Sequence, residues 1–458
     1  MTKQVYDYDL LVIGAGAAGS TAASTAAGDG IRVALVERDK IGGTCLNYGC
    51  DPTKTMIHIA SLLYHAGHAD QFGLHISGAK VDWASVISWV HQVQQRIRGG
   101  TSEEAVTDLS HKGIDVLQGE ASFVSPHELS VAGRIVSAAR IIIATGGQNF
   151  IPPIEGLNEV GFITNVQAVS LHTLPNHLAV VGGGSIGIEF AQMFNRFGVG
   201  VTVLERSSMI LDKEDREVAD SLCSLLAKEG LRLETNAELK HVQRAAQGKS
   251  LTIRCGERAE EQLVVDEILL AIGRHPAIAS LHLEKAGVKT SKKGIEVDAT
   301  LRTNVPHIWA AGDVTGGLQF THVAYEQGKL AYHNAFAQEP QPFGNRVIPW
   351  VTFSDPALAH VGKTEEQLRQ EKVEYRAARM YFKDVERAIA EGTTDGLVKL
   401  LIDKQGKFLG GHILAPGAGD LLAPVILAMQ ADLPAEAVAS TIMPYPTMVE
   451  GVRWAADR

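Results

Sequence analysis

The chain has 458 residues, of which 45% are hydrophobic and 46 are glycine, so it is long enough for about three domains with buried cores. Its 42 basic and 52 acidic residues give a formal net charge of −10, which disfavours nucleic acid or an anionic membrane as the main partner. We find no secretory signal, no run of about 20 apolar residues and only four cysteines, so we expect a protein of the reducing cytoplasm without a membrane span.

A glycine-rich turn follows the first predicted strand. Residues 9–13 form a short apolar run, residues 20–27 a helix of small residues, and residues 31–36 a second strand that ends at Glu37. The turn between the first strand and the helix contains Gly14, Gly16 and Gly19. In this context glycines allow a tight turn and the close approach of a pyrophosphate to the helix N-terminus, while the acid binds ribose hydroxyls. The segment therefore predicts a dinucleotide-binding, Rossmann-like fold.

Two cysteines come next, in the sequence Gly-Gly-Thr-Cys-Leu-Asn-Tyr-Gly-Cys. Cys45 and Cys50 stand at the start of a predicted helix that continues through Leu62. This spacing can bring two sulfurs within bonding distance, and the free N–H groups of a helix N-terminus stabilise a thiolate, which then reacts at neutral pH. The alternative is a structural disulfide or a pair of buried thiols. Glycine on both sides implies the close approach of something large and flat, so the pattern favours a redox-active pair.

The dinucleotide fingerprint then occurs a second time. Strands are predicted at residues 178–181 and 201–204. The second set contains Gly182, Gly184, Gly187 and Glu205, each 168 positions after its counterpart in the first set. Such a constant spacing indicates two mononucleotide-type folds in series. One site beside a dithiol and another far along the chain suggest an electron relay, from a nicotinamide to a flavin and from the flavin to the cysteines.

The rest of the chain contains further strands of the nucleotide-type folds, and then a C-terminal part with a different pattern of strands and helices. Further strands that end in turns are predicted at residues 141–147, 269–274 and 308–313, with a helix at 324–335. The pair Pro152-Pro153 marks the crossing into the second dinucleotide domain. Beyond about residue 340, antiparallel strands are predicted at 398–402 and 409–414, and helices at 421–429 and 434–440. This last part has no nucleotide motif, and we interpret it as a dimerisation domain.

Together, these motifs resemble those of the pyridine-nucleotide disulfide oxidoreductases along essentially the whole chain. The shared set comprises the cysteine motif, both fingerprints, Ala-Thr-Gly, Ala-x-Gly-Arg and Ala-Gly-Asp. The resemblance implies an α/β fold with two Rossmann-like dinucleotide-binding domains in tandem plus a C-terminal α+β dimerisation domain. The expected domains are an FAD-binding domain at 1–150 and 275–340, an NAD(P)H-binding domain at 151–274, and a dimerisation domain at 341–458. It also implies FAD and either NADH or NADPH as cofactors, and a homodimer.

The resemblance also assigns roles to residues. It implies that Cys50 is the charge-transfer thiol against the flavin, that Cys45 is the interchange thiol that meets the substrate, and that Lys54 and Glu189 form a charged pair beside the flavin. The residues expected at FAD are Gly14, Gly16, Gly19, Glu37, Gly43, Thr44, Lys54, Ala121, Thr145, Gly146, Gly312, Asp313 and Ala324. Those expected at NAD(P)H are Gly182, Gly184, Gly187, Glu205 and Gly273. Because Glu205 would repel a 2′-phosphate, we expect NADH to be used at least as well as NADPH.

The C-terminal motif departs from that of the disulfide reductases. Members that reduce disulfides carry His-Pro-Thr-x-x-Glu, whose histidine comes from the partner subunit and moves the proton. Here the segment reads Tyr445-Pro-Thr-Met-Val-Glu450, so a tyrosine replaces the histidine. A phenol with a pKa near about 10 is a poor base at neutral pH, whereas an imidazole near about 6.5 is a good one. The segment is similar to the end of mercuric reductases, although Tyr445 packing at an interface is the alternative.

The chemistry expected from these motifs is electron transfer to a soft metal ion. NAD(P)H would reduce the flavin, the flavin would reduce the Cys45–Cys50 pair, and both cysteines would bind the metal only transiently, with Hg(II) as the first candidate because a cation held by two thiolates needs no base. One alternative is a dihydrolipoyl dehydrogenase or another disulfide reductase, and another is a flavin-binding redox sensor without turnover. Mercuric reductases also carry a vicinal cysteine pair near the C-terminus, which is absent around Arg458, so the route of metal delivery stays open.

One residue of the cysteine motif has no counterpart in the family pattern. Asp51 follows Cys50 directly, where relatives usually have an apolar residue. It would either cap a helix that starts at Pro52 or raise the pKa of the cysteines.

Overall fold

The structure is a computed structural model that describes residues 5–344 and 347–458. Contacts divide the chain into two units, each assembled from segments far apart in the sequence. Unit 1 consists of Met1–Thr55, Ile87–Phe150 and Gly273–Asn345, and unit 2 consists of Met56–Val86, Ile151–Ile272 and Arg346–Arg458. The three-domain division expected from the sequence stays a prediction.

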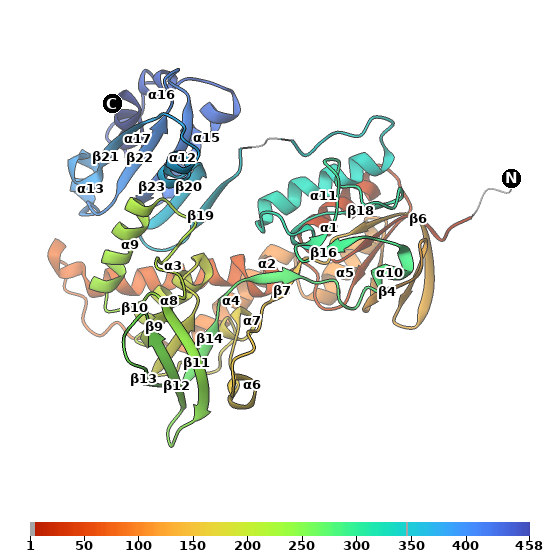
Figure 1. Ribbon diagram of the computed structural model, residues 1–458, viewed down its shortest axis with the longest axis horizontal. Helices are drawn as coiled ribbons and strands as arrows, with labels where there is room; N and C mark the ends of the chain where they lie inside the picture. The colour runs from red at the N-terminus through yellow and green to blue at the C-terminus, as the bar shows by residue number, and fades with distance from the viewer. Residues whose placement is uncertain (1–4, 345–346) are drawn as a thin grey trace. The chain divides into compact units, whose positions relative to one another are not determined.

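Unit 1 is built around a seven-stranded sheet (Figure 1). Its parallel part has the order β3 (Ile114–Gln118), β2 (Val33–Glu37), β1 (Tyr8–Ile13) and β6 (Arg134–Ile143), and β18 (Ile308–Ala310) pairs with the other edge of β6. The first half of β6 continues into an antiparallel ribbon with β5 (Glu128–Val131) and β4 (Ala121–Ser125). Strands β1 and β2 are apolar on both faces, as expected for a parallel sheet that is covered on both sides.

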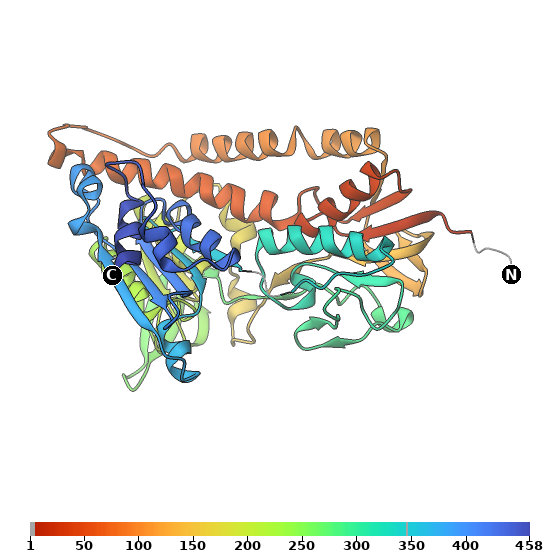
Figure 2. The same ribbon diagram turned by 90° about the horizontal axis from the view of Figure 1, so that it is seen from above.

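Two helices cover one face of this sheet, α1 (Ala17–Gly28) and α11 (Thr321–Phe336), which Figure 1 shows in red and cyan. They approach closely because a glycine lies at the contact: a Cβ at Gly328 would be 2.2 Å from the carbonyl oxygen of Ala18. Two further helices, α4 (Trp83–Arg98) and α5 (Ser102–His111), follow each other end to end (Figure 2).

The first part of unit 2 repeats the dinucleotide fold. Its parallel sheet has the order β10 (Arg232–Glu234), β9 (Gly200–Leu204), β8 (His177–Val181) and β14 (Glu267–Leu270). The helices of this part are α8 (Ser185–Arg196) and α9 (Arg216–Lys228), and a separate antiparallel sheet contains β11 (Ala237–Arg244), β12 (Lys249–Cys255) and β13 (Glu261–Val265). The glycine turn that follows β8 therefore has the same strand–turn–helix context as the turn that follows β1.

The C-terminal part of unit 2 is an antiparallel five-stranded sheet with helices packed against it. The strand order is β19 (Pro349–Thr352), β20 (Ala357–Gly362), β23 (Phe408–Ala415), β22 (Leu397–Ile402) and β21 (Arg376–Tyr381). Helices α15 (Ala423–Gln430), α16 (Ala435–Ala439) and α17 (Glu450–Asp457) share one hydrophobic core with these strands. The parallel sheets and this α+β part confirm the fold class predicted from the sequence.

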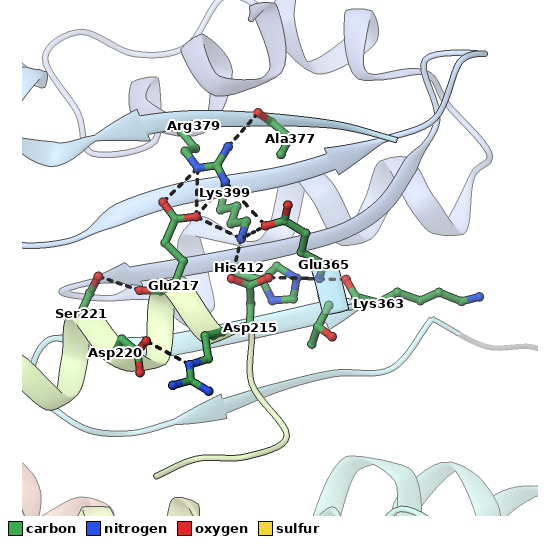
Figure 3. A network of polar contacts seen from close by, with 12 residues as sticks. Asp215, Glu217, Asp220, Ser221, Lys363, Glu365, Ala377, Arg379, Lys399 and His412 are labelled. Carbon is green, nitrogen blue, oxygen red and sulfur yellow. Dashed lines mark hydrogen bonds and ion pairs between the residues drawn. The ribbon is translucent and has the colours of Figure 1, made fainter. Parts of the chain in front are cut away.

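A buried cluster of charges joins the two parts of unit 2 (Figure 3). The Lys399 ammonium on β22 lies 2.7 Å from Asp215, 3.0 Å from Glu217 and 2.6 Å from Glu365. Arg379 on β21 adds a second cation at 2.8 Å from Glu217. Since Asp215 and Glu217 stand at the start of α9, the cluster connects the nucleotide-type fold to the C-terminal sheet through ion pairs that are largely closed to water.

The remaining elements are the 18-residue helix α3 and a set of shorter helices, strands and turns. They are α2 (Gly43–Tyr48), α3 (Cys50–Gly67), α6 (Leu157–Val160), α7 (Asn165–Ala168), α10 (Leu283–Ala286), α12 (Glu365–Gln370), α13 (Glu386–Glu391), α14 (Ala418–Leu421), β7 (Gly147–Asn149), β15 (Arg274–Pro276), β16 (Thr290–Ser291) and β17 (Gly294–Ile295), with 3-10 turns at Ala69–Phe72, Asp313–Thr315 and Phe382–Asp384. The helix predicted at 421–429 corresponds to α15, which begins two residues later, after the separate short helix α14.

Candidate functional site

The first glycine-rich turn has the geometry that dinucleotide binding requires. Gly14 has φ +100°, and a Cβ at this position would lie 2.5 Å from the carbonyl oxygen of Ala144. A Cβ at Gly19 would lie 1.8 Å from the carbonyl oxygen of Gly14. At Gly16, in contrast, a Cβ would meet only Gly43, at 4.0 Å. The first N–H groups of α1 are therefore open to a phosphate group.

The acid at the end of β2 is held in place by the backbone. Glu37 is buried and accepts hydrogen bonds from the N–H groups of Ala15 at 2.7 Å and Asp39 at 2.8 Å. Its carboxylate is thus fixed beside the glycine turn, where a ribose of a bound dinucleotide is expected.

The second turn has the same construction in unit 2. Gly182 has φ +109° and a Cβ there would lie 2.5 Å from the carbonyl oxygen of Ala271. A Cβ at Gly187 would lie 1.9 Å from the carbonyl oxygen of Gly182, whereas one at Gly184 would meet nothing within 4 Å. The position at the N-terminus of α8 is therefore open in the same way as Gly16 in the first turn.

Glu205 in the second fingerprint corresponds to Glu37 in the first. It accepts hydrogen bonds from the N–H groups of Gly183 and Ser207, both at 2.6 Å. The neighbouring Arg206 is exposed. The carboxylate at this strand end is therefore fixed by two backbone donors, while the guanidinium next to it is not buried in the fold.

The two motif cysteines belong to different helices, the 6-residue α2 and the 18-residue α3. Cys45 lies in α2 and Cys50 is the first residue of α3. Gly49 separates them with φ −131° and ψ −113°, and a Cβ there would lie 3.0 Å from the carbonyl oxygen of Thr44. The expectation that both cysteines stand at the start of one helix is wrong, because Gly49 separates α2 from α3 between them. A hydrogen bond nevertheless links the two thiols.

The thiols are free, and their protonation is unequal. A hydrogen bond from Cys45, together with the Thr321 hydroxyl and the Lys54 charge, lowers the pKa of the Cys50 thiol to about 6. The same hydrogen bond, with burial and the Cys50 charge, raises the pKa of the Cys45 thiol. The Thr321 hydroxyl lies 3.3 Å from the Cys50 sulfur. At neutral pH the pair is therefore one thiolate, on Cys50, and one protonated thiol, on Cys45.

Further charged and polar groups lie around the pair. Asp51 stands in the first turn of α3, and burial raises the pKa of its carboxyl while Lys54 lowers it. Because α3 begins at Cys50, the expectation that Asp51 caps a helix starting at Pro52 is wrong. The Tyr325 phenol on α11 has a raised pKa, from burial and then from the charges of Cys45, Asp51 and Cys50. All these groups belong to unit 1.

The residues expected at FAD fit such a group. The Thr145 hydroxyl is buried and, among the described residues, makes no hydrogen bond, so a polar ligand atom would satisfy it. A Cβ at Gly43 would lie 2.6 Å from the Cα of Gly16, so the two backbone segments pack directly against each other. Because both residues are glycines, no side chain projects from either one at this contact. Burial raises the pKa of the Asp313 carboxyl, which receives a hydrogen bond of 2.7 Å from Arg274. The Asp313 carboxylate can accept hydrogen bonds from the hydroxyls of a ribityl chain.

The remaining residues predicted at the cofactors lie in turns and element ends. Thr44 lies in α2 and its hydroxyl accepts from Arg274 at 3.3 Å. Three of these residues are glycines with positive φ angles: Gly146 (+67°), Gly273 (+108°) and Gly312 (+82°). The N–H of Gly312 also donates a hydrogen bond of 2.8 Å to the Gln327 side chain. Ala121 begins β4, and Ala324 is buried in α11. Their roles at bound cofactors stay predictions.

The other predicted catalytic residues belong to unit 2. Glu189 is buried in α8 and accepts a hydrogen bond of 2.9 Å from the N–H of Phe353. Its pairing with Lys54, which belongs to unit 1, stays a prediction. Glu450 is buried at the start of α17 and accepts from the N–H of Thr447 at 3.2 Å, whereas Tyr445 is 70% exposed.

Sequence reasoning missed three residues of this site, Thr321, Tyr325 and Arg274. The first two occupy neighbouring turns of α11, which starts three residues before the predicted helix at 324–335. Arg274 is part of the Ala-x-Gly-Arg motif, but the sequence did not predict its partners. Its guanidinium donates hydrogen bonds to the Asp313 carboxylate and, at 2.6 Å, to the carbonyl oxygen of Gly147. The motif itself was the available indication, since an arginine after a buried strand needs a partner.

Two family models account for nearly the whole chain. Residues 8–328 match the model for pyridine nucleotide-disulphide oxidoreductases, and residues 348–456 match the dimerisation domain of the same group. The chain belongs to this family. Its members depend on FAD and use NAD(P)H as the electron donor, so this protein is an FAD-dependent oxidoreductase.

Individual relatives cover most of the chain but carry different names. The chain is 36% identical to the mercuric reductase of Staphylococcus aureus, over 98% of this chain and 82% of the relative. It is 35% identical to the dihydrolipoyl dehydrogenase of Chlamydia pneumoniae, over 97% and 95%. Among solved structures it is similar to the Cu(II) complex of the HOCl-induced flavoprotein disulfide reductase RclA from Escherichia coli, with a TM-score of 0.86 and 32% identity, over 97% of this chain and 98% of that one.

Two absences hold for residues 5–344 and 347–458. In this part of the chain, no helix is long and apolar enough to cross a membrane. Within the same residues, no group of three or more His, Cys, Asp or Glu side chains is arranged to hold a metal ion.

Proposed function

We propose that this oxidoreductase passes two electrons from NAD(P)H through FAD to the Cys45–Cys50 pair and on to a soft metal cation, with Hg(II) as the first candidate. The observation that carries the proposal is the pairing of a thiolate–thiol dithiol with Tyr445 in the position of the family's histidine. This combination can hold a thiophilic cation, but it has no imidazole to protonate a thiol leaving group.

The dithiol suits a soft cation by its chemistry. Bound FAD supplies the acceptor for hydride from NAD(P)H and passes the electrons to the cysteines. Hg(II) would replace the proton of the Cys45 thiol and bind the Cys50 thiolate, which forms two S–Hg bonds. The displaced proton would pass to solvent. Two electrons supplied by NAD(P)H would then convert the bound cation to Hg(0), both S–Hg bonds would break with their electron pairs left on sulfur, and the two cysteines would return as thiolates. Soft thiolate ligands favour such metals over hard cations.

The missing base disfavours small disulfides as the main substrate. Reduction of a disulfide releases a thiolate that must be protonated, and the family uses histidine for this step. A tyrosine side chain is a poorer acid–base catalyst at neutral pH than an imidazole. Reduction of a metal cation has no such leaving group, so Tyr445 is compatible with it.

Cu(II) is a second candidate acceptor. The solved relative RclA, which is 32% identical, is described as a Cu(II) complex. Copper binds thiolates strongly in its reduced Cu(I) form, so a dithiol could reduce two Cu(II) ions by one electron each.

The proposal is tested by anaerobic oxidation of NADH and NADPH with a panel of acceptors: Hg(II), Cu(II), lipoamide and glutathione disulfide. We expect metal-dependent turnover that is lost in the Cys45→Ser and Cys50→Ser variants. Fast turnover of lipoamide or glutathione disulfide, with none for either metal, would contradict the proposal and support a disulfide reductase. If none of the acceptors supports oxidation of NADH or NADPH, the result would favour a redox sensor without turnover.

A further inference from the structure

The residue after Cys50 carries a negative charge that the fold does not neutralise. Asp51 is half-buried in the first turn of α3. In the part of the chain that the structure describes, its carboxylate makes no hydrogen bond and no ion pair, and only the charge of Lys54 acts on it favourably. A half-buried carboxylate without a donor costs free energy, and the dipole of α3 compensates only part of that cost.

This carboxylate lies in the same electrostatic environment as the dithiol. Its charge acts on Cys45, Cys50 and Tyr325, so all four groups are near one another in unit 1. The groups that face the dithiol from α2, α3 and α11 are thus a thiol, a thiolate, a carboxylate, a hydroxyl, a phenol and the ammonium of Lys54. Asp51 therefore adds a negative charge beside the two reacting sulfurs.

We propose that Asp51 is a specificity residue that makes the dithiol react with cationic acceptors and disfavours anionic ones. This inference rests on the proposed function, in which the acceptor is a metal cation. It adds that the positive charge of the acceptor is a property the site selects. A negative charge close to a reacting thiolate raises the local concentration of cations and lowers that of anions. The same charge acts by repulsion against dianionic substrates such as glutathione disulfide.

The alternative role of Asp51 is structural. An acid in the first turn stabilises a helix through the macrodipole, and this effect would not depend on the charge of any acceptor. An experiment must therefore compare probes that differ only in charge. The experiment must also measure the reactivity of the cysteines without catalytic turnover. Its outcome then does not depend on whether the acceptor named in the proposed function is correct.

Methanethiosulfonates meet both conditions. A cysteine thiolate attacks the sulfenyl sulfur, a disulfide bond forms, and methanesulfinate leaves, so no further oxidant or reductant takes part. The holoenzyme is reduced anaerobically with NADH and treated with the trimethylammonium-ethyl, sulfonato-ethyl or methyl reagent. The neighbouring cysteine then displaces the added thiol and closes the Cys45–Cys50 disulfide. The rate is therefore followed as the loss of both free thiols, which are alkylated with iodoacetamide in timed samples and counted by mass spectrometry. The ratio of the cationic to the anionic rate is independent of how much thiolate is present.

For Asp51→Asn, we expect the cationic rate to fall and the anionic rate to rise by about fivefold each, relative to the neutral reagent, at low ionic strength. The rate ratio would then change by about 25-fold, and added salt would shrink the difference. Asp51→Glu keeps the charge and should keep the ratio within about twofold of the unmodified protein. Cys223, whose thiol has a pKa raised by burial to about 11, serves as an internal reference in the same samples.

Glu103→Gln is the matched control. Glu103 is also a first-turn acid of a helix in unit 1, and its carboxylate interacts with Thr101 and Arg98 instead of the thiols. Its removal changes the net charge equally and should leave the ratio at the dithiol unchanged. An unchanged ratio in Asp51→Asn would overturn the inference and leave Asp51 as a helix-stabilising residue. An equal change in Glu103→Gln would overturn it as well, because net charge alone would then explain the effect.

Discussion

The ionisation of the dithiol depends on single side chains, and the Thr321 hydroxyl is the one the sequence did not reveal. It lies 3.3 Å from the Cys50 sulfur and helps to lower the pKa of that thiol to about 6. Thr321→Val keeps the branched shape at the start of α11 but removes the donor. We expect the pKa of Cys50 to rise by about one unit, because a hydrogen bond to a charged acceptor is lost. The pH dependence of iodoacetamide alkylation at Cys50 measures this.

Thr321→Ser is the control for this substitution. It retains the hydroxyl, so the alkylation profile should stay close to that of the unmodified protein. A profile that does not move in Thr321→Val would show that Cys45 and the Lys54 charge stabilise the thiolate without Thr321.

Glu205 makes a prediction about the nicotinamide. Its carboxylate is fixed by the N–H groups of Gly183 and Ser207, where the adenosine ribose of the second dinucleotide is expected. A fixed carboxylate accepts from both ribose hydroxyls and repels a 2′-phosphate. We therefore expect kcat/KM for NADH to be at least equal to that for NADPH. Glu205→Ala should shift the ratio toward NADPH by about tenfold or more.

The comparison uses initial rates with each nucleotide at a fixed acceptor concentration. The equivalent substitution at the first fingerprint, Glu37→Ala, should affect FAD retention instead of nucleotide preference. A hundredfold preference of the unmodified protein for NADPH would contradict the assignment and point to Arg206 as the 2′-phosphate ligand.

At the scale of elements, the stability of unit 2 depends on the cluster between α9 and strands β21 and β22. Lys399 and Asp215 are each 1% exposed, so removal of the cation leaves a buried carboxylate without its partner. We expect Lys399→Met to destabilise this region by about 3–5 kcal/mol. Hydrogen exchange of the β22 and β23 amides measures the change locally, which avoids a two-state assumption for a chain of several domains.

The matched control for Lys399 is Lys404→Met. Lys404 pairs with Glu374 on the surface, where both side chains are 69% exposed. Exposed pairs contribute about 0–1 kcal/mol, so this variant should exchange like the unmodified protein. Equal exchange in both lysine variants would mean that the buried cluster adds nothing to the stability of the sheet.

The same region should make unit 2 sensitive to acid. Burial, and then the nearby His360, lower the pKa of His412 to about 3, and its ring donates to the Lys363 carbonyl oxygen at 3.0 Å. The unfolded chain binds a proton at His412 below about pH 6.5. The folded chain does not bind this proton until about pH 3. Stability is therefore lost as pH falls through this window, by up to about 1.4 kcal/mol per unit.

A second loss is expected at lower pH. Burial opposes ionisation of Glu365 and Glu217, but hydrogen bonds leave both pKa values lowered, from Lys399 and Tyr375 to Glu365 and from Arg379 and Lys399 to Glu217. Their contribution therefore disappears only below about pH 4. In His412→Gln, urea unfolding should show a flatter profile between pH 6.5 and 4, with the lower loss retained. The same slope in both proteins would show that His412 titrates normally.

The sequence predicted the elements that depend on local patterns. Both glycine turns, their flanking strands and the acids Glu37 and Glu205 were found because strand, turn and helix follow each other within about 30 residues. The sequence did not predict the cluster at Lys399, since its members come from positions 215 to 399 and look like ordinary surface charges. Nor did it predict the break at Gly49, which places the two cysteines in separate helices and where a Cβ would lie 3.0 Å from the Thr44 carbonyl oxygen.

At the scale of the whole molecule, the C-terminal part has the surface of a dimerisation domain. Leu427, Leu433, Ile442 and Tyr445 are exposed apolar or aromatic side chains within the residues that match the family's dimerisation domain. Ile442 is 94% exposed, which is unusual for a large aliphatic side chain of a single chain. We therefore expect the protein to be a homodimer in solution.

The homodimer gives Tyr445 its predicted role. If the C-terminal segment of one subunit closes the dithiol site of the other, the Tyr445 phenol can contact a metal that is bound at Cys45. Tyr445→Phe removes one oriented hydroxyl, so metal-dependent turnover should fall by about tenfold or more, while reduction of the flavin by NAD(P)H stays unchanged. Tyr445→His should raise turnover of disulfides, because it restores a base that is half-ionised near neutral pH. Stopped-flow reduction and steady-state rates separate the two steps, and sedimentation gives the oligomeric state. An active monomer, or equal rates of Tyr445→Phe with every acceptor, would mean that this residue only packs at a surface.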